Sequence, residues 1–281
     1  MSQAITKIKS RIKSVSGAYK VTSAMKLVST VKLKQWRNKM LSHKEYVLEV
    51  NNIVDLLLKC SEKVSSPFMN ININATKNLY VVITSTLGLC GSYNSNIFRV
   101  GDNIIKDNDD VIILGGKGIT HYKNSAFHKI EGFDGYNSIA DMVYINHLCK
   151  FIFEKYQKGE YKEVHIIYTE YKNSLAFIAK DFKLLPLKLE TQESNVGYPP
   201  IMEPNGQELV NEVIPFYLES VVFSKLLESS VCEQGARSNA MENATSNAEE
   251  ILNELQIEFN KERQAAITQE IIEIVAASKA V

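Results

Sequence analysis

Proline is absent from the chain before Pro67, and within residues 207–281 it occurs once, at Pro215. Glycine is equally scarce in these two regions, where it occurs only as Gly17 and Gly235. Proline and glycine are the residues that most disfavour the interior of an α-helix. Their scarcity at both ends of the chain therefore removes the usual obstacles to two very long helices.

Cysteine is also sparse: four residues lie far apart and form no C-x-x-C pair, namely Cys60, Cys90, Cys149 and Cys232. The five histidines are scattered as well. This distribution argues against a disulfide framework or a zinc site, and it predicts reduced thiols in a cytosolic protein. No apolar run approaches the roughly 20 residues that span a bilayer, so the sequence predicts no direct membrane insertion.

Acidic residues are missing from the N-terminal region. The first 44 residues contain eleven Lys or Arg and no Asp or Glu, whereas residues 208–281 contain thirteen Glu against five Lys or Arg. The chain as a whole has no net charge, which hides this opposition between its ends. Because partners respond to local charge, the two ends are expected to attract each other.

Apolar residues recur at helical spacing in both terminal regions. The N-terminal stripe runs through Ile5, Ile8, Ile12 and Val15, then Val21, Met25, Val28 and Val31. Beyond Gly235 the C-terminal stripe runs through Ala240, Ala244, Ala248, Ile251, Leu255, Phe259, Ala266, Ile267, Ile271 and Ile274. Its small residues allow two helix backbones to approach closely. The stripes therefore predict that the two helices pair with each other.

The C-terminal helix is predicted to be the longer of the two. At roughly 1.5 Å per residue, about 55 helical residues reach about 80 Å and about 70 residues reach about 105 Å. The far end of the second helix is therefore expected to extend past the first as a single helix.

Between the terminal regions the pattern changes to short β-branched runs, typical of buried strands, at residues 79–84, 111–115 and 164–168. Helices are predicted between them, over residues 92–105 and 138–156. This alternation of strand and helix favours a small α/β domain with a largely parallel sheet.

An edge strand is predicted over residues 182–187, where Pro186 suits an edge, and a loop over residues 191–206. The sequence thus predicts an α/β protein with a long antiparallel coiled coil. Residues 1–66 and 207–281 form the paired helices, and residues 67–206 form the inserted α/β domain.

Two glycine-containing segments follow predicted strands, where a catalytic loop would lie. Residues 115–118 (Gly-Gly-Lys-Gly) lack the G-x-x-x-x-G-K-[ST] spacing of a phosphate loop, and no Ser or Thr follows Lys117 to hold Mg²⁺. Cys90 lies before a predicted helix that would favour its thiolate, but no His is evident as its base. The expected role of these glycines is a tight turn. The sequence predicts no catalytic residue, no cofactor and no metal.

The basic N-terminal region admits other interpretations. An acid-poor amphipathic start is typical of a cleaved transit peptide, but Lys outnumbers Arg here and the pattern continues to about residue 60. The positive charges would also suit nucleic acid or an anionic membrane surface. Neither requires an acidic helix at the other end, and Trp36 is the only clear stacking residue. The sequence favours an acidic protein partner and no nucleic acid.

Three segments carry a resemblance to a known family: residues 20–28 (KVTSAMKLV), 86–94 (TLGLCGSYN) and 260–275 (NKERQAAITQEIIEIV). Residues 233–237 (EQGAR) and 243–248 (NATSNA) support it. In this order, over essentially the whole chain, they resemble the signatures of the gamma subunit of F-type ATP synthases. The resemblance implies an antiparallel coiled coil of the terminal helices with an α/β domain inserted near its foot.

The function that this resemblance implies is mechanical. In the family the coiled coil threads a hexamer of alpha and beta subunits, and the foot joins the epsilon subunit and the membrane rotor ring. The shaft is asymmetric, so its rotation moves three catalytic beta sites through different nucleotide affinities. The gamma subunit itself does no chemistry. The implied location is peripheral, on the cytoplasmic side of a bacterial cell membrane.

Interface residues follow from the resemblance position by position. Met25 matches a position near an acidic loop of beta, although a role in the coiled-coil core is equally open. Contacts with alpha and beta are implied for Arg237, Arg263, Gln264, Thr268 and Glu270. The lysines and arginine Lys7, Lys9, Arg11, Lys13 and Lys26 would steer the shaft against acidic loops. Residues 271–281 would form the tip.

Some residues depart from the family pattern. Thr86 and Leu87 stand where Asp-Arg is usual, and Ser92 replaces a common glycine. These residues lie in the inserted domain, so they concern contacts with epsilon or the ring. Two alternatives stay open: a gamma-like shaft of an F1-like ATPase coupled to other machinery such as motility, and a stand-alone α/β enzyme with helical oligomerisation arms.

Overall fold

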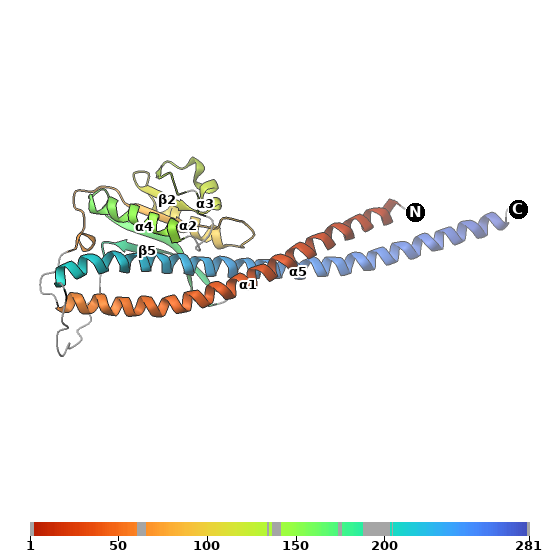
Figure 1. Cartoon of the computed structure of the whole chain (residues 1–281). Helices are drawn as coiled ribbons and strands as arrows, with labels where there is room; N and C mark the ends of the chain where they lie inside the picture. Colours follow the sequence, from red (N-terminus) through yellow and green to blue (C-terminus); the bar gives the residue numbers. More distant parts are fainter. Residues whose placement is uncertain are drawn as a thin grey trace. The chain divides into compact units, whose positions relative to one another are not determined.

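The computed structural model describes residues 3–60, 66–133, 135–136, 142–173, 176–187, 203 and 205–279. Contacts group the chain into two units, and the long helices α1 (Gln3–Cys60) and α5 (Gly206–Lys279) contribute to both (Figure 1). Lys32–Ala236 form one, called the sheet unit below. Met1–Val31 and Arg237–Val281 form the other, called the two-helix unit. The division predicted at residues 66 and 206 stays a prediction.

The sheet unit contains five strands in the order β3-β2-β1-β4-β5. β1 pairs in parallel with β2 and β4, β2 pairs in parallel with β3, and β5 is antiparallel to β4. The strands are β1 (Leu79–Ile83), β2 (Asp110–Leu114), β3 (His128–Lys129), β4 (Val164–Tyr171) and β5 (Phe177–Leu185). The predicted α/β domain with a largely parallel sheet is confirmed.

Helices cover both faces of this sheet. They are α2 (Tyr93–Ile104), α3 (Gly116–His121) and α4 (Met142–Gln157), with short 3₁₀ turns η1 (Pro67–Met69) and η2 (Tyr122–Asn124). Val81 and Ile112 face a core completed by α4 and α5, whereas Val82 and Ile113 face a core completed by α2 and η2. Because adjacent strand residues point to opposite faces, strands covered on both faces are expected to be largely apolar. All ten residues of β1 and β2 are buried, and the one charged residue among them is Asp110, which pairs with Lys77 and accepts from the Tyr161 hydroxyl.

The structure differs from the sequence prediction in four elements of the sheet unit. β5 begins at Phe177, five residues before the predicted start, and Pro186 lies just after its end. α4 begins at Met142 within the described residues, and the predicted start at residues 138–141 lies outside them. α3 and β3 were not predicted, because both are short and α3 opens with Gly-Lys-Gly. Most of the predicted loop, residues 191–202, also lies outside the described residues.

The two-helix unit consists of α1 and α5 packed side by side, with α5 continuing past the end of α1 (Figure 1). Three contacts set an antiparallel register: the hydroxyls of Thr30 and Ser238 (3.0 Å), the Lys26 Nζ and Glu242 Oε1 atoms (2.9 Å), and the hydroxyls of Thr22 and Thr245 (2.9 Å). The predicted antiparallel pair and its protruding second helix are confirmed.

The buried seam of this unit differs in part from the predicted stripe. Ile5, Ile8, Ala248 and Leu255 are buried as expected, but the seam then passes through Ser29, which is 2% exposed. The predicted seam residues Val21, Val28 and Val31 are more than half exposed, and Ile251 is 43% exposed. The predicted seam was wrong at these positions because small residues with hydroxyl groups fill the contact between the two helix backbones. A search for apolar residues at helical spacing does not detect such residues.

None of the helices in the described part of the chain has a stretch both long and apolar enough to traverse a bilayer.

A charged cluster joins the edge strand β5 to β4. The imidazole of His165 lies between two carboxylates, with Nδ1 2.9 Å from Asp181 Oδ2 and Nε2 3.1 Å from Glu163 Oε2. Lys183 donates to the other Glu163 oxygen at 2.6 Å, and the Tyr80 ring stacks on the imidazole at 5.1 Å. Only a doubly protonated ring can donate to both carboxylates, so this geometry favours the imidazolium.

The same groups determine the direction of the pKa shifts. Burial disfavours a charged His165, but the carboxylates of Asp181 and Glu163 outweigh it and hold the pKa of His165 above its ordinary value. Burial of Glu163 is likewise outweighed by Lys183 and His165, which lower its pKa. Burial, then the carboxylates of Asp109 and Asp181, raise the pKa of Tyr80 to about 12, so Tyr80 stays neutral.

We expect the β4–β5 pairing to weaken as the pH rises through the raised pKa of His165. A raised folded-state pKa stabilises the fold below the ordinary value of the group, and this contribution is lost at higher pH. Urea unfolding from pH 5 to pH 9 should therefore show a stability difference between the natural chain and His165→Gln that is largest at low pH. His128→Gln is the control, because the side chain of His128 is 72% exposed and its ion pair is worth little. A difference that grows with pH would contradict the imidazolium assignment.

Candidate functional site

The two segments considered as catalytic loops serve the packing of the sheet unit. Gly115 has φ +100°, and a Cβ there would lie 2.3 Å from the Thr84 carbonyl oxygen. The amide of Gly118, near the start of α3, donates to Thr84 Oγ1 at 2.9 Å, so this amide is already hydrogen-bonded within the chain. Close packing against Thr84 therefore accounts for glycine at these positions, and a bound phosphate is not needed to explain it.

Cys90 is buried, and its Sγ lies 3.2 Å from Asn94 Nδ2 and 3.6 Å from Ser85 Oγ. Asn94 also accepts from the Ser85 amide at 3.1 Å, which links the end of β1 to the start of α2. Among the described residues, no three His, Cys, Asp or Glu side chains gather in the arrangement that would hold a metal ion. The geometry around Cys90 is that of a structural thiol.

The outer surface of the two-helix unit carries the sequence-predicted interface residues. Arg263, Gln264, Thr268 and Glu270 are exposed on α5, and the Thr268 hydroxyl donates only to the Gln264 carbonyl within its own helix, at 2.9 Å. Met25 is half-buried on α1. These residues lie on one unit, but they do not form a cluster with shared hydrogen bonds.

Arg237 differs from the other predicted residues because its side chain is only 6% exposed. Its neighbour Ser238 is also buried and meets Thr30 of α1. The burial of Arg237 within the chain distinguishes it from the exposed residues predicted to contact alpha and beta, and its own predicted contact stays a prediction.

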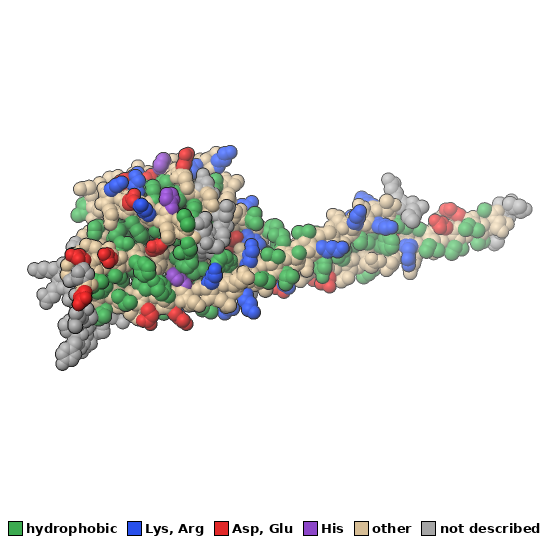
Figure 2. Space-filling view, viewed as in Figure 1, with side chains coloured by type: hydrophobic (Ala, Val, Ile, Leu, Met, Phe, Trp, Pro, Cys, Tyr) green, Lys and Arg blue, Asp and Glu red, His purple; other side chains and the backbone are tan. Residues whose placement is uncertain are grey.

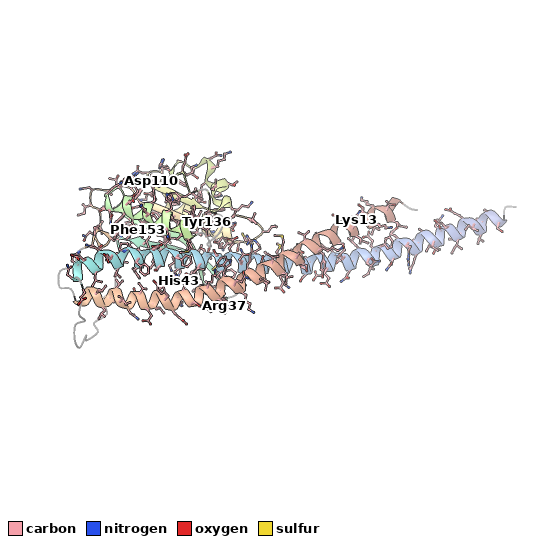
Figure 3. All side chains as sticks on the ribbon, viewed as in Figure 1. Lys13, Arg37, His43, Asp110, Tyr136 and Phe153 are labelled. Carbon is pink, nitrogen blue, oxygen red and sulfur yellow. The ribbon has the colours of Figure 1, made fainter. Side chains whose placement is uncertain are left out.

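Charge on the two-helix unit is unevenly distributed. Lys26 pairs with Glu242, as predicted for oppositely charged helices. Five other basic residues of α1 are solvent-exposed: Lys7, Lys9, Arg11, Lys13 (labelled in Figure 3) and Lys20. Figure 2 shows Lys and Arg side chains along the paired helices. One part of the basic face thus pairs within the chain, and another part faces solvent.

Apolar side chains on the same unit also face solvent. On α1 these are Val21, Leu27, Val28 and Val31, which are 51% to 67% exposed. On the last turns of α5 they are Ile267, Ile271, Ile272, Ile274 and Val275, which are 48% to 68% exposed. Apolar patches of this kind mark interaction surfaces. The α1 patch was not predicted from the sequence, because the helical spacing placed three of these residues, Val21, Val28 and Val31, in the seam.

In the sheet unit, α5 supplies hydrogen bonds that a neighbouring strand would otherwise make. β4 pairs with β1 only as far as Ile167, and no strand of the described residues borders its last residues on that side. There the Thr169 amide donates to Ser229 Oγ at 3.1 Å, and the Tyr171 amide donates to Glu228 Oε1 at 2.9 Å. We call Glu228 and Ser229 the strand clamp. It ties the sheet directly to α5.

Further contacts surround the strand clamp. Cys232 of α5 donates to the Thr169 carbonyl at 3.4 Å. A Cβ on Gly235 would lie 2.7 Å from the Phe177 ring, so the only glycine inside α5 beyond its first residue makes room for β5. Arg37 of α1 lies 6.0 Å from the centre of the Tyr171 ring (Figure 3 labels Arg37). The end of β4 is therefore held by both long helices.

We expect Ser229→Ala to lower the free energy of unfolding by about 1–3 kcal/mol, because it leaves a buried backbone amide without an acceptor. Glu228→Gln should lower the free energy of unfolding by less than Ser229→Ala does, because the side-chain oxygen of Gln can still accept from the Tyr171 amide. Urea unfolding checks both. Ser246→Ala, at an exposed position of α5, is the control and should change stability by less than about 0.5 kcal/mol. Equal losses for Ser229→Ala and Ser246→Ala would argue against the strand clamp.

Comparisons with known proteins agree with this arrangement. The family model described as ATP synthase matches residues 4–281. The ATP synthase gamma chain of Mesoplasma florum is 35% identical over 98% of both chains. The sodium ion specific ATP synthase gamma chain of Acetobacterium woodii is 32% identical over 100% of this chain and 99% of its own.

Solved structures give the same fold. The rotor of Euglena gracilis mitochondrial ATP synthase matches with a TM-score of 0.65 at 16% identity, over 94% of this chain and 99% of that chain. The central stalk and c-ring structure of Tetrahymena thermophila mitochondrial ATP synthase matches with a TM-score of 0.54 at 25% identity, over 80% and 99%. With the matched length, the paired helices and the inserted sheet all in agreement, the chain belongs to the ATP synthase gamma chain family.

Proposed function

We propose that this gamma chain is a non-catalytic rotor shaft, which turns inside a hexamer of alpha and beta subunits whose beta subunits hold the catalytic sites. The observation that carries the proposal is the outer surface of the two-helix unit, with exposed valines and isoleucines beside exposed lysines and arginines. Such a surface is costly in water, and a surrounding protein would cover it. The isoleucines on the last turns of α5 would fit an apolar surface of the surrounding subunits, and the basic residues of α1 would attract acidic loops.

The asymmetry of this surface is what a rotor needs. A shaft can drive neighbouring sites through different states only if its contact free energy with each site depends on the angle. In the two-helix unit, α1 carries the basic residues and one apolar patch, whereas the last turns of α5 carry isoleucines and Glu270. Each of three beta subunits would therefore meet a different side.

At the sheet unit we propose the epsilon subunit and the membrane rotor ring as partners, on the cytoplasmic side of a bacterial cell membrane. The strand clamp supports this arrangement, because a force applied to the sheet passes into α5 through hydrogen bonds at Thr169 and Tyr171. α5 is one continuous helix from Gly206 to Lys279, so the same element carries the exposed residues proposed to meet alpha and beta.

We expect the double change Arg263→Ala and Gln264→Ala to weaken coupled ATP hydrolysis without unfolding the chain. Both side chains are exposed, and an arginine fork and an amide suit hydrogen bonds to partner carboxylates. The chain is co-expressed with its own alpha and beta subunits, and hydrolysis is measured on the purified complex. A drop of about tenfold corresponds to losing about 1.4 kcal/mol of contact free energy.

Asn260→Ala with Lys261→Ala is the matched control, because both residues are exposed one turn earlier on α5. Failure of the natural chain to co-purify with alpha and beta, or ATPase activity of the chain alone, would contradict the shaft function. Normal assembly with equal hydrolysis by both double variants would contradict only the role of Arg263 and Gln264.

A further inference from the structure

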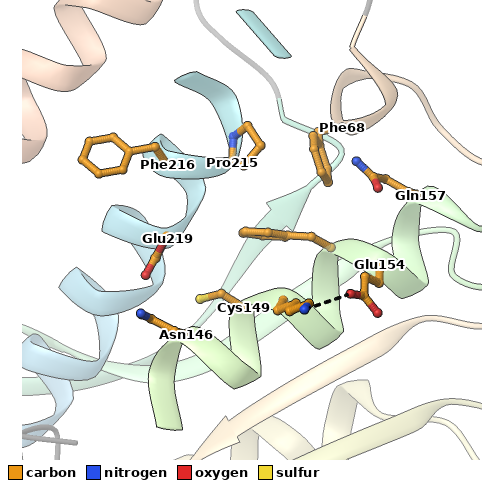
Figure 4. A pocket seen from close by; sticks show the side chains of 10 residues that line it. Phe68, Asn146, Cys149, Glu154, Gln157, Pro215, Phe216 and Glu219 are labelled. Carbon is orange, nitrogen blue, oxygen red and sulfur yellow. Dashed lines mark ion pairs between the residues drawn. The ribbon is translucent and has the colours of Figure 1, made fainter. Parts of the chain in front are cut away.

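A pocket in the sheet unit lies between α4, α5 and η1 (Figure 4). Its volume is about 350 Å³, within the range of ligand pockets in proteins. Three phenyl rings line it, from Phe68, Phe153 and Phe216, together with two carboxylates, from Glu154 and Glu219. The proposed shaft surface does not include this pocket, whereas two of its lining residues, Phe68 and Cys149, also belong to the hydrophobic core beside the sheet.

The aromatic wall is fixed by packing. Phe68 is buried, and its ring meets the Phe153 ring edge to face at a centroid distance of 5.4 Å. The Tyr156 ring stacks behind Phe68 at 6.5 Å, and its hydroxyl donates to the Asn70 carbonyl at 2.7 Å. These contacts hold Phe68 and Phe153 before any ligand arrives, so binding would not require those two rings to be ordered.

The charge of the pocket is negative. The lining includes two carboxylates, Glu154 and Glu219, and one cation, Lys150. The Lys150 Nζ atom lies 3.9 Å from Glu154 Oε1. That pair is weak, since the two side chains are 76% and 52% exposed. Glu219 has no cation of its own among the pocket residues. When the Asn146 side-chain amide is oriented to satisfy both of its neighbours, its nitrogen donates to Glu219 and to the Met142 carbonyl.

Cys149 lies on the same wall and adds no charge. Burial, and then the Glu219 carboxylate, raise the pKa of the Cys149 thiol to about 12, so it stays protonated. The pocket thus offers phenyl faces, a neutral thiol and a carboxylate, Glu219, that has no cationic partner among the lining residues. Aromatic faces beside a carboxylate favour a flat cation on an apolar stem, which an arginine side chain provides.

We propose that this pocket binds an arginine side chain of the protein partner at the sheet unit, with the guanidinium at Glu219 and the stem against Phe153. The proposal rests on the proposed function in one respect: a shaft must be joined to a partner protein at this unit. The phenyl rings bury the methylene groups, and the carboxylate replaces the water that the guanidinium loses.

The test uses the full-length chain and two tripeptide probes, acetyl-Leu-Arg-Leu-amide and its citrulline analogue, which has the same shape but no charge. Amide shifts in the ¹H–¹⁵N spectrum are followed during titration. We expect the arginine peptide to bind saturably at the pocket and about tenfold more tightly than the citrulline peptide, as a desolvated cation–aromatic contact predicts. Glu219→Gln should remove this preference, and Phe153→Leu should weaken both peptides.

Glu212→Gln is the matched control, because Glu212 is exposed on the same helix but does not line the pocket. Thermal melts show that each variant is folded. Equal affinity for the two peptides, no saturable binding, or unchanged binding by Glu219→Gln would overturn the proposal. Tighter binding of spermidine than of the arginine peptide would overturn the assignment to a protein side chain. None of these outcomes depends on ATP hydrolysis, so the shaft function is judged separately.

Discussion

Ile5 and Ile8 of α1 are buried in the two-helix unit together with Ala248 and Leu255 of α5. Each helix alone would expose an apolar stripe to water, whereas helices within proteins draw most of their stability from packing such a stripe. The close approach is possible because hydroxyl and small residues lie between the backbones, at Ser29 and along the alanines of α5. Every functional conclusion depends on this pairing, since it determines which side chains remain outside.

The packing of α1 against α5 bears on function because it determines which side chains stay exposed on the outer surface of the two-helix unit. A seam made only of large apolar residues would have hidden Val21 and Val28 and left a polar, featureless rod. Because hydroxyl residues fill part of it, valines, isoleucines and lysines remain on the outer surface. In the sheet unit α5 has a different role: its side chains accept hydrogen bonds from the β4 amides that lie beyond the end of β1. One helix therefore serves as both a shaft and a sheet support.

Much of this fold could be predicted from the sequence. Missing prolines and helical spacing predicted α1 and α5, and β-branched runs predicted β1, β2 and β4 within a few residues. Shorter elements were not predicted. β3, for example, has two residues, which are too few to show a periodic pattern. The seam was partly wrong because hydrophobicity alone cannot show that Ser29 would be buried. The strand clamp was also missed, since Ser229 is an ordinary helix residue until β4 is placed beside it.

The antiparallel pairing can be measured directly with a double-cysteine chain, Thr22→Cys with Thr245→Cys, under mild oxidation. The two hydroxyls are 2.9 Å apart, so cysteine thiols at the same two positions would lie close enough to react with each other. Thr22→Cys with Ser246→Cys is the control, because the next helix residue points about 100° away. If α1 and α5 pair in this register, a disulfide should form rapidly within one chain for the first pair of cysteines and hardly at all for the second. Equal or reversed yields would contradict the pairing of α1 with α5.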